Sequence, residues 1–213
     1  MNFETNLDKA AKFAGKFHTG QIRKSTGIPY VSHCFDVMKQ VAEYGAQADK
    51  ILSAALLHDL IEDCDIDKHE IGFTFGIDIA QIVEHCSRTP TLNSKKQKLD
   101  WLRGFENKTI ESIVIKIADR YCNVTDYIRA GNSKYAMWYN LQAYPLYSTY
   151  FKREHEVPQE WRSGIRSDIY AYNQKMELLL GHSLKYLETE HFEDTFFNFD
   201  RKAVDGLLIR GVK

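Results

Sequence analysis

The 213-residue sequence predicts an all-α protein. Apolar residues recur at intervals of three and four along most of the chain, as they do on the buried face of a helix. Alternating strand patterns bounded by hairpin turns are scarce, and Gly27, Pro29 and Gly45 fall between the periodic segments. The length is enough for one domain with a substantial core, or for one domain with an appendage.

The first helix is predicted over residues 5–18, with Thr5 or Asn6 as its N-cap. A loop with Gly27 and Pro29 follows, and Ser32 is a candidate cap for the next helix. That helix carries His33 in its first turn.

Residues 51–63, ILSAALLHDLIED, predict a single buried helix that ends in polar residues. His58 and Glu62 are four residues apart, and so are Asp59 and Asp63, so the two pairs form adjacent stripes on one side of the helix. Burying such groups is costly unless a metal ion or a cationic group compensates them. The alternative is a helix whose last turn reaches the surface and is hydrated.

The second half of the chain continues the helical pattern. A helix should bury Ile79, Ile82, Val83 and Cys86. A polar loop over 87–97 and a short helix over 98–105 should follow. Residues 110–123 predict a buried helix with Asp119 on its apolar face. The aromatic segment from 134 to 150 reads as helix interrupted by Pro145, and residues 160–188 as a last long helix.

The composition restricts the classes of partner. Lysine and arginine number 28 against 29 aspartate and glutamate, so the net charge of −1 gives no global case for nucleic acid or an anionic membrane. No apolar run approaches the ~18 residues that a membrane span needs. No signal peptide is visible, and four cysteines without metal-site spacing are typical of buried thiols in a reducing compartment. We therefore expect a cytoplasmic protein.

Four polar residues lie on otherwise buried faces: His33, His58, Asp59 and Asp119. Each alone is more often structural than functional. Together, two imidazoles and two carboxylates suit Mn²⁺, Fe²⁺, Co²⁺ or Zn²⁺ better than Ca²⁺ or Mg²⁺. A metal there would activate a water molecule as the nucleophile.

Further polar residues complete a candidate site. Glu62 and Asp63 are placed to orient the water and move its proton. Arg23 and Lys24, in the loop before His33, offer a planar fork and a point charge for an anionic ligand; the alternative is a hydrated loop pair. Asn123 follows Asp119 by four residues, and it is either a ligand contact or a helix C-cap.

Three segments in this order, HTGQIRKSTGIPYVSH, ALLHDLIED and IKIADRYCNVTDY, resemble the hydrolase domain of the RelA/SpoT family of HD-type enzymes, especially its small stand-alone alarmone hydrolases. The resemblance implies an HD-domain helical bundle that removes the 3′-diphosphate from (p)ppGpp with Mn²⁺. It also implies roles for individual residues: metal ligands at His33, His58, Asp59 and Asp119, catalytic acids at Glu62 and Asp63, the base near Arg23, the diphosphates near Lys24 and the ribose near Asn123.

The resemblance covers roughly residues 5–150. We therefore expect a hydrolase domain over residues 1–150 and a helical extension over residues 151–213 packed on the same domain. The expected partner is a small nucleotide, and the oligomeric state, including a homo-oligomer, stays open. Departures from the family pattern at Ile28, Tyr121, Cys122 and Asp126 are expected to border the nucleoside pocket, so both guanine and adenine alarmones remain candidates.

Three other functions stay open at this point. One is an HD-type phosphohydrolase that acts on other nucleotides. Another is a binding module that keeps the alarmone pocket without turnover. A third is a partner-binding role centred on the aromatic segment around residues 138–150, which would require an exposed aromatic patch.

Overall fold

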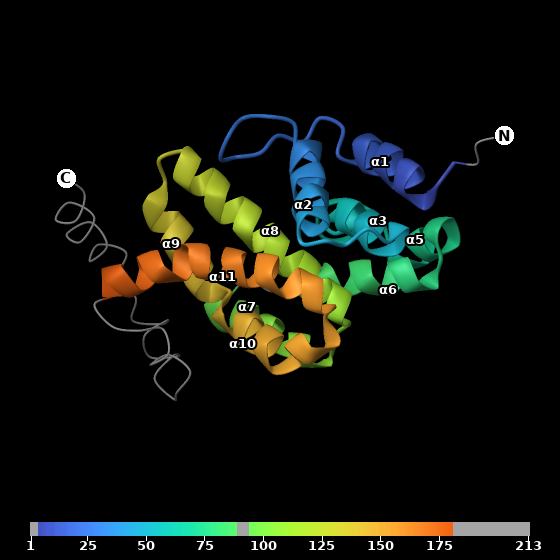
Figure 1. Cartoon of the computed structure of the whole chain (residues 1–213). Coiled ribbons are helices and arrows are strands. Elements are labelled where there is room, and N and C mark those ends of the chain that lie inside the picture. The colour runs from blue at the N-terminus through green and yellow to red at the C-terminus, as the bar shows by residue number, and fades with distance from the viewer. Residues whose placement is uncertain (1–3, 89–93, 181–213) are drawn as a thin grey trace.

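The computed structural model of the chain describes residues 4–88 and 94–180. Within these residues every regular element is a helix, apart from one isolated antiparallel bridge between Ile22 and Pro29 (Figure 1). The predicted all-α class is therefore confirmed. No helix in this part of the chain is both long enough and apolar enough to cross a bilayer.

The longest described connection, residues 18–30, joins the first two helices. In chain order the elements are α1 (Asn6–Phe17), α2 (Val31–Glu43), α3 (Asp49–Leu57), α4 (Leu60–Asp63), α5 (Lys68–Phe75), α6 (Ile77–Cys86), α7 (Lys95–Arg103), the 3₁₀ turn η1 (Gly104–Asn107), α8 (Ile110–Arg129), α9 (Ser133–Gln142), α10 (Tyr144–Arg153), the 3₁₀ turn η2 (Glu154–Glu156) and α11 (Gln159–Leu180).

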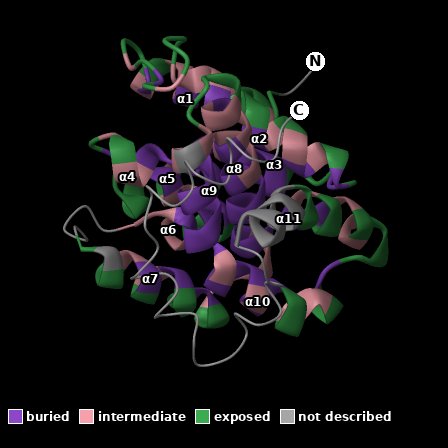
Figure 2. Ribbon diagram, turned by 90° about the vertical axis from the view of Figure 1, so that its left-hand side faces the viewer, coloured by how far each residue is buried: buried purple, intermediate pink, exposed green. Residues whose placement is uncertain are grey.

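Helix α8 is the central element of the fold. It packs against α2, α3 and α6 on one side and against α9, α10 and α11 on the other (Figure 1). Its apolar face, which includes Ile113, Val114 and Ile117, is buried as the sequence predicted. Figure 2 shows the buried residues concentrated along α8 and its neighbours. Asp119 therefore lies in the interior, where a carboxylate requires a compensating partner.

The starts of the first two helices differ in how well the sequence predicted them. Thr5 caps α1 as expected, in a reciprocal box with Asp8. The prediction that Ser32 caps α2 is wrong, because α2 already begins at Val31. The Ser32 hydroxyl instead donates to the Pro29 carbonyl at 2.8 Å, which is the local bond available to a serine inside the first turn.

The predicted single helix over residues 51–63 is interrupted. Helix α3 ends at Leu57, His58 and Asp59 form a turn, and α4 covers Leu60–Asp63. The Asp59 backbone, with φ −102° and ψ −1°, departs from regular helix and ends the hydrogen-bond ladder. The prediction of a continuous helix is therefore wrong. The sequence did not reveal the break because a two-residue turn hardly disturbs the apolar period.

Two helices go beyond the sequence prediction. Helix α5 lies in a stretch for which no element was predicted, and Asp67 caps it by accepting from the amides of His69 and Glu70. Helix α7 begins at Lys95, where Ser94 provides a capping box, rather than at residue 98. Part of the predicted polar loop, residues 89–93, lies outside the described residues.

The last three helices cover one side of α8. Pro145 lies in the first turn of α10, where proline is tolerated, so the predicted interruption is confirmed. Helix α11 buries Ile165 and Ile169, and the Tyr44 hydroxyl donates to Asp168 at 2.6 Å. The part of the predicted last helix beyond residue 180 lies outside the described residues, and the division at residue 150 stays a prediction.

Candidate metal centre and substrate cleft

The structure brings together the four residues predicted as metal ligands. His33 comes from the first turn of α2, His58 and Asp59 from the turn between α3 and α4, and Asp119 from the middle of α8. All four are buried, and one potential ligand atom from each lies within 4.8 Å of the others. Residues 86 positions apart in the chain thus form one polar cluster in the core.

The nitrogen and oxygen atoms alternate around this cluster. His33 Nε2 lies 3.0 Å from Asp119 Oδ1 and 3.7 Å from Asp59 Oδ2. His58 Nε2 lies 3.0 Å from Asp59 Oδ2 and 3.8 Å from Asp119 Oδ1. Two imidazole nitrogens and two carboxylate oxygens therefore converge on one point, which is the arrangement that a transition-metal ion requires.

The orientation of His58 is set by its second nitrogen. Nδ1 lies 2.8 Å from the Ala55 carbonyl, which can only accept, so Nδ1 carries the proton in this bond. In the neutral ring, the Nε2 lone pair then faces two carboxylates, and Nε2 has no hydrogen-bond partner of regular geometry. Metal-bound histidines are typically held in this way.

A positive charge at Nε2 would resolve this conflict. Burial alone lowers the pKa of His58, but Asp59 and Asp119 outweigh it and raise the pKa to about 10. Without a metal, a proton therefore occupies the position between the imidazole and the carboxylates. A divalent cation would compensate both carboxylates at once, so the donor set fits such an ion.

Lys116 is a buried neighbour of the cluster that the sequence reasoning missed. Its Nζ lies 2.9 Å from Asp119 Oδ2 and 3.8 Å from Asp59 Oδ1, the oxygens on the far side of the two carboxylates. Burial opposes its charge, but the two aspartates raise its pKa above the ordinary lysine value. The spacing of three residues between Lys116 and Asp119 on one helix was the available signal.

Tyr30 is a second residue that the sequence did not indicate. Its hydroxyl donates to Asp59 Oδ2 at 2.6 Å, and its ring contacts those of His18 and His33. The bond fixes the Asp59 carboxylate from the side of the loop. Tyrosine at the end of a loop has no distinctive spacing, so no sequence signal would have found it.

Arg23 and Asn123 form a chain of contacts that ends at the cluster. Arg23 is buried, and its Nη2 lies 2.7 Å from Asp126 Oδ2 and 3.0 Å from Asn123 Oδ1. The Asn123 amide in turn donates to Asp119 Oδ1. Asn123 lies inside α8, so the C-cap alternative is excluded. Lys24, next to Arg23, is exposed at the edge of the cleft.

The two candidate catalytic acids have different surroundings. Both Glu62 oxygens accept hydrogen bonds from Arg88, from the guanidinium at 2.7 and 3.1 Å and from the backbone amide at 3.1 Å. Asp63 has no ion-pair partner among the described residues. Partial removal from water and the nearby Asp59 carboxylate raise the pKa of Asp63. The surroundings of Asp63 therefore favour its protonated form.

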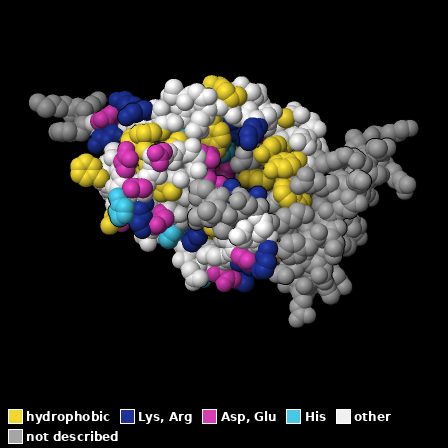
Figure 3. All heavy atoms as spheres, turned by 180° about the vertical axis from the view of Figure 1, so that it is seen from behind, with side chains coloured by type: hydrophobic (Ala, Val, Ile, Leu, Met, Phe, Trp, Pro, Cys, Tyr) yellow, Lys and Arg dark blue, Asp and Glu magenta, His cyan; other side chains and the backbone are white. Residues whose placement is uncertain are grey.

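A cleft of about 570 Å³ opens over the cluster. The loop residues 21–25 form one wall, and Asn123, Tyr127 and Tyr139 form part of another. Figure 3 shows acidic and basic side chains gathered at a hollow on this face, with hydrophobic side chains beside it. A cleft of this size accommodates a small organic ligand.

The positions that depart from the family pattern do not line this cleft. Ile28, Tyr121 and Cys122 are not among the residues that line it, and Asp126 pairs with Arg23 and, at longer range, with Arg129. The expectation that these four residues border the nucleoside pocket stays a prediction.

The helical fold and the cluster of two histidines and two aspartates define an HD-type hydrolase. A family model described as HD domain matches residues 10–136, and the chain belongs to this family. The resemblance to the RelA/SpoT-type hydrolases within it is also confirmed by individual relatives.

Among these relatives, the human protein named guanosine-3′,5′-bis(diphosphate) 3′-pyrophosphohydrolase MESH1 is 27% identical over 183 residues, which is 84% of this chain and 93% of that protein. The Xenopus tropicalis MESH1 is 32% identical over 55% of this chain and 67% of its own length. A Vibrio cholerae enzyme of the same name is 36% identical over 50% of this chain but only 16% of its own length.

A solved structure has the same fold. It is described as a metazoan ortholog of SpoT that hydrolyzes ppGpp and plays a role in starvation responses. It superposes with a TM-score of 0.56 over 72% of this chain and 98% of the other, at 20% identity. The match shows that the overall helical fold is shared.

Proposed function

We propose that this protein hydrolyses (p)ppGpp at the 3′-diphosphate, giving pyrophosphate and GDP or GTP. The observation that carries the proposal is the buried set of His33, His58, Asp59 and Asp119, which opens into a cleft whose loop carries Arg23 and Lys24. The human and mouse relatives, which this chain matches over most of their length, are named for this reaction. The adenine counterparts, (p)ppApp, are a second candidate substrate.

The same four residues are the proposed ligands of Mn²⁺. Two imidazoles with two carboxylates suit this ion, and an octahedral ion held by four side chains keeps positions for water and a substrate oxygen. When bound, the ion would lower the pKa of a coordinated water and offset negative charge at the phosphate. Another divalent transition metal is compatible with the same donors.

The remaining residues bind the nucleotide and handle protons. The oxygen of water forms a bond to the 3′-phosphorus, the bond from phosphorus to the ribose 3′-oxygen breaks, and that oxygen takes a proton. Asp63 is the proposed proton carrier, and Glu62, held by Arg88, orients the attacking water. Lys24 attracts the diphosphates, and Asn123 contacts the ribose.

Arg23 is proposed to contact the base with the flat face of its guanidinium. Its ion pair with Asp126 and its bond to Asn123 support the proposal, because they hold the guanidinium at the wall of the cleft. A held guanidinium loses little conformational freedom when a base stacks on it.

The first test is pyrophosphate release from ppGpp and ppApp, measured side by side with Mn²⁺ and then with EDTA. Metal-dependent release from either substrate is the expected result, and the ratio of the two rates gives the base preference. If neither is hydrolysed by the Mn²⁺-loaded protein, the proposal fails. A panel of other nucleotides then identifies a different HD-type phosphohydrolase, and ppGpp binding without turnover identifies a binding module.

A further inference from the structure

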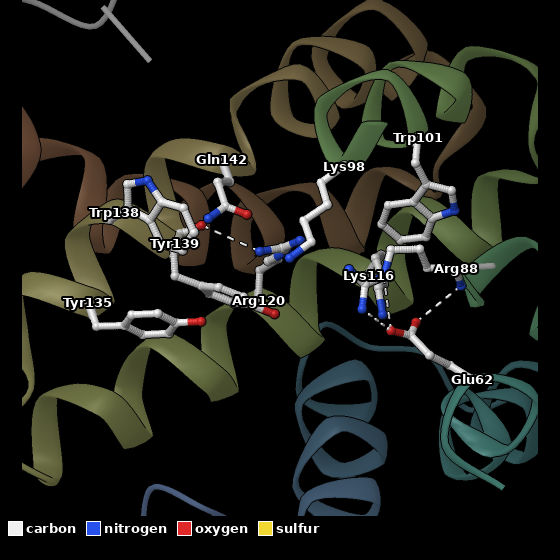
Figure 4. Close-up of a pocket in the computed structure, with 10 residues that line it drawn as sticks. All are labelled: Glu62, Arg88, Lys98, Trp101, Lys116, Arg120, Tyr135, Trp138, Tyr139 and Gln142. Atoms are coloured by element: carbon white, nitrogen blue, oxygen red, sulfur yellow. Dashed lines mark hydrogen bonds and ion pairs between the residues drawn. The ribbon is translucent and has the colours of Figure 1, made fainter. Parts of the chain in front are cut away.

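A second, smaller cavity lies beside the metal centre. It has a volume of about 160 Å³ and is lined by residues of α7, α8 and α9, together with Glu62 and Arg88 (Figure 4). Complete ligand sites usually measure about 300–1,000 Å³, so this cavity is too small for a nucleotide. It can hold only one part of a larger ligand, or a small ion.

Arg120 is a buried cation in this cavity without an anionic partner. Only 6% of the residue is exposed, and no carboxylate of residues 4–88 or 94–180 lies within ion-pair distance of it. Its guanidinium lies 4.0 Å from the centre of the Tyr139 ring and donates one long bond, 3.4 Å, to the Tyr139 carbonyl. Its Nε has no hydrogen-bond partner in the described part of the chain. Buried charges are normally paired, so this guanidinium is suited to bind an anion.

The other polar groups of the cavity also offer hydrogen-bond donors. Gln142 is 5% exposed, and its Nε2 has no hydrogen-bond partner among residues 4–88 and 94–180. Figure 4 shows the ends of Gln142 and Lys98 near the Arg120 guanidinium, reaching it from α9 and α7. Among the described residues that line the cavity, Glu62 is the only carboxylate, and both of its oxygens accept hydrogen bonds from Arg88. The cavity therefore presents positive charge and unused N–H groups.

The cavity adjoins the catalytic cleft. Four residues line both spaces: Glu62, Arg88, Lys116 and Tyr139. Lys116 also contacts Asp119 at 2.9 Å, so an anion in the cavity would lie next to the metal centre. The loop with Arg23 and Lys24 lines only the larger cleft. A ligand with its nucleoside in the cleft and its reacting phosphorus at the metal would thus point a further phosphate into the cavity.

We propose that this cavity, formed around Arg120, Lys98 and Gln142, binds the distal phosphate of the 3′-diphosphate and then retains the pyrophosphate product. The inference rests on the proposed function for the identity of the ligand. The anion-binding property itself rests on the unpaired Arg120 and on the donors around it. Pyrophosphate is therefore the product that should inhibit through this cavity, whereas GDP should bind in the larger cleft.

The test compares Lys98→Gln and Arg120→Lys with the control Lys96→Gln. Lys96 is on the same helix as Lys98, its side chain is 73% exposed, and it lines neither space. Inorganic pyrophosphate and GDP are titrated separately into the Mn²⁺-loaded proteins by calorimetry at one fixed free Mn²⁺ concentration. A charge-assisted hydrogen bond is worth about tenfold in affinity. We expect the Kd of pyrophosphate to rise about tenfold in the two test variants and the Kd of GDP to stay unchanged.

Equal pyrophosphate binding by the wild type, Lys98→Gln and the control would overturn the proposal, as would the absence of pyrophosphate binding. Lys98 is only half-buried, so Lys98→Gln keeps the test valid if Arg120→Lys fails to fold. Hydrolysis of ppGpp is measured in parallel. If the wild type hydrolyses ppGpp but the variants bind pyrophosphate as it does, the cavity proposal fails and the proposed reaction stands. If the variants bind pyrophosphate more weakly but the wild type does not hydrolyse ppGpp, the proposed reaction fails and the anion site stands.

Discussion

At the scale of single residues, the two ring nitrogens of His58 have different surroundings. The Ala55 carbonyl takes the Nδ1 proton, and this leaves Nε2 facing Asp59 and Asp119. Lys116 contacts the other oxygens of the same carboxylates, and the Tyr30 hydroxyl donates to Asp59 Oδ2. The aspartates therefore have little freedom to turn away, and the cluster is preorganised for a cation before one binds.

Removing one ligand should abolish metal binding. In Asp59→Ala or His58→Ala, the remaining donors no longer balance a divalent ion, so we expect bound metal and hydrolysis both to fall to background. Metal content measured by mass spectrometry after dialysis and pyrophosphate release are the two readouts. Asp65→Ala, which changes an exposed aspartate nearby, is the control. A variant at Asp59 with wild-type metal content and rate would contradict the site assignment.

Glu62 should affect turnover but not metal binding. Glu62→Gln keeps an acceptor oxygen for Arg88 and removes the charge that orients the attacking water. We expect bound metal to be unchanged and kcat to fall by about 10² to 10⁴, the range typical of acid–base groups. If kcat stays at the wild-type value, Glu62 is a bystander and Asp63 acts alone.

At the scale of elements, the site requires α2, the α3–α4 turn and α8 to stay in register. Helix α11 supports this arrangement from outside, because it packs on α8 and contacts the end of α2 through Tyr44 and Asp168. Gly164 lies against Tyr44, and an added Cβ would come within 3.0 Å of its ring. The packing of α11 is thus close and includes one partly buried carboxyl group, that of Asp168.

Asp168 makes this packing sensitive to pH. Burial, with a smaller contribution from Glu43, raises its pKa to about 6 in the folded protein, although the Tyr44 hydroxyl opposes the shift. Between pH 4 and 6 the folded state binds more protons at this group than the unfolded state, so stability is lost as pH rises through that window. Asp168→Asn should remove this loss while keeping the bond from Tyr44.

Urea denaturation at pH 4.5 and pH 7.5 measures this effect. The midpoint of Asp168→Asn should exceed that of the wild type at pH 7.5, and the difference should shrink at pH 4.5. The control is Glu160→Gln, an exposed change at the start of the same helix, and its midpoint should follow that of the wild type at both pH values. If the midpoints of Asp168→Asn and the wild type differ by the same amount at both pH values, Asp168 is not protonated in the folded state.

At the scale of the whole molecule, a metal ion would join helices that lie far apart in the chain. Its four ligands come from positions 33 to 119, so the ion can bind tightly only to the folded protein. A ligand at a hundred times its Kd stabilises the folded state by about 2.7 kcal/mol. For a chain of this size, that corresponds to a rise of roughly 5–10 °C in Tm.

Metal removal should therefore lower the melting temperature. We expect EDTA-treated protein to melt several degrees below the Mn²⁺-loaded protein, and added Mn²⁺ to restore the difference. Differential scanning calorimetry gives both values, with Asp59→Ala as the variant that should not respond. Identical melting with and without metal would mean that the cluster is a purely structural polar group.

Much of the fold could be predicted because helical periodicity is a local property. The intervals of three and four placed α1, α6 and α8 correctly, and the same pattern put Asp119 inside. The local signals failed where the same residues are compatible with two local structures. Ser32 had the residue type of a cap but bonds Pro29 inside the first turn, and the turn at His58 and Asp59 left the apolar pattern intact.

By itself, the sequence determined which groups are available for chemistry: two histidines and two aspartates on buried faces, with an acidic pair one turn further on. Only the tertiary structure decided what those groups meet. The packing of α8 against α2 and α3 brings the four together, places Lys116 behind the aspartates and leaves Arg120 buried without an anion. The reason is physical: periodicity records which face of a helix is buried, whereas partners are set by the packing of elements distant in the chain.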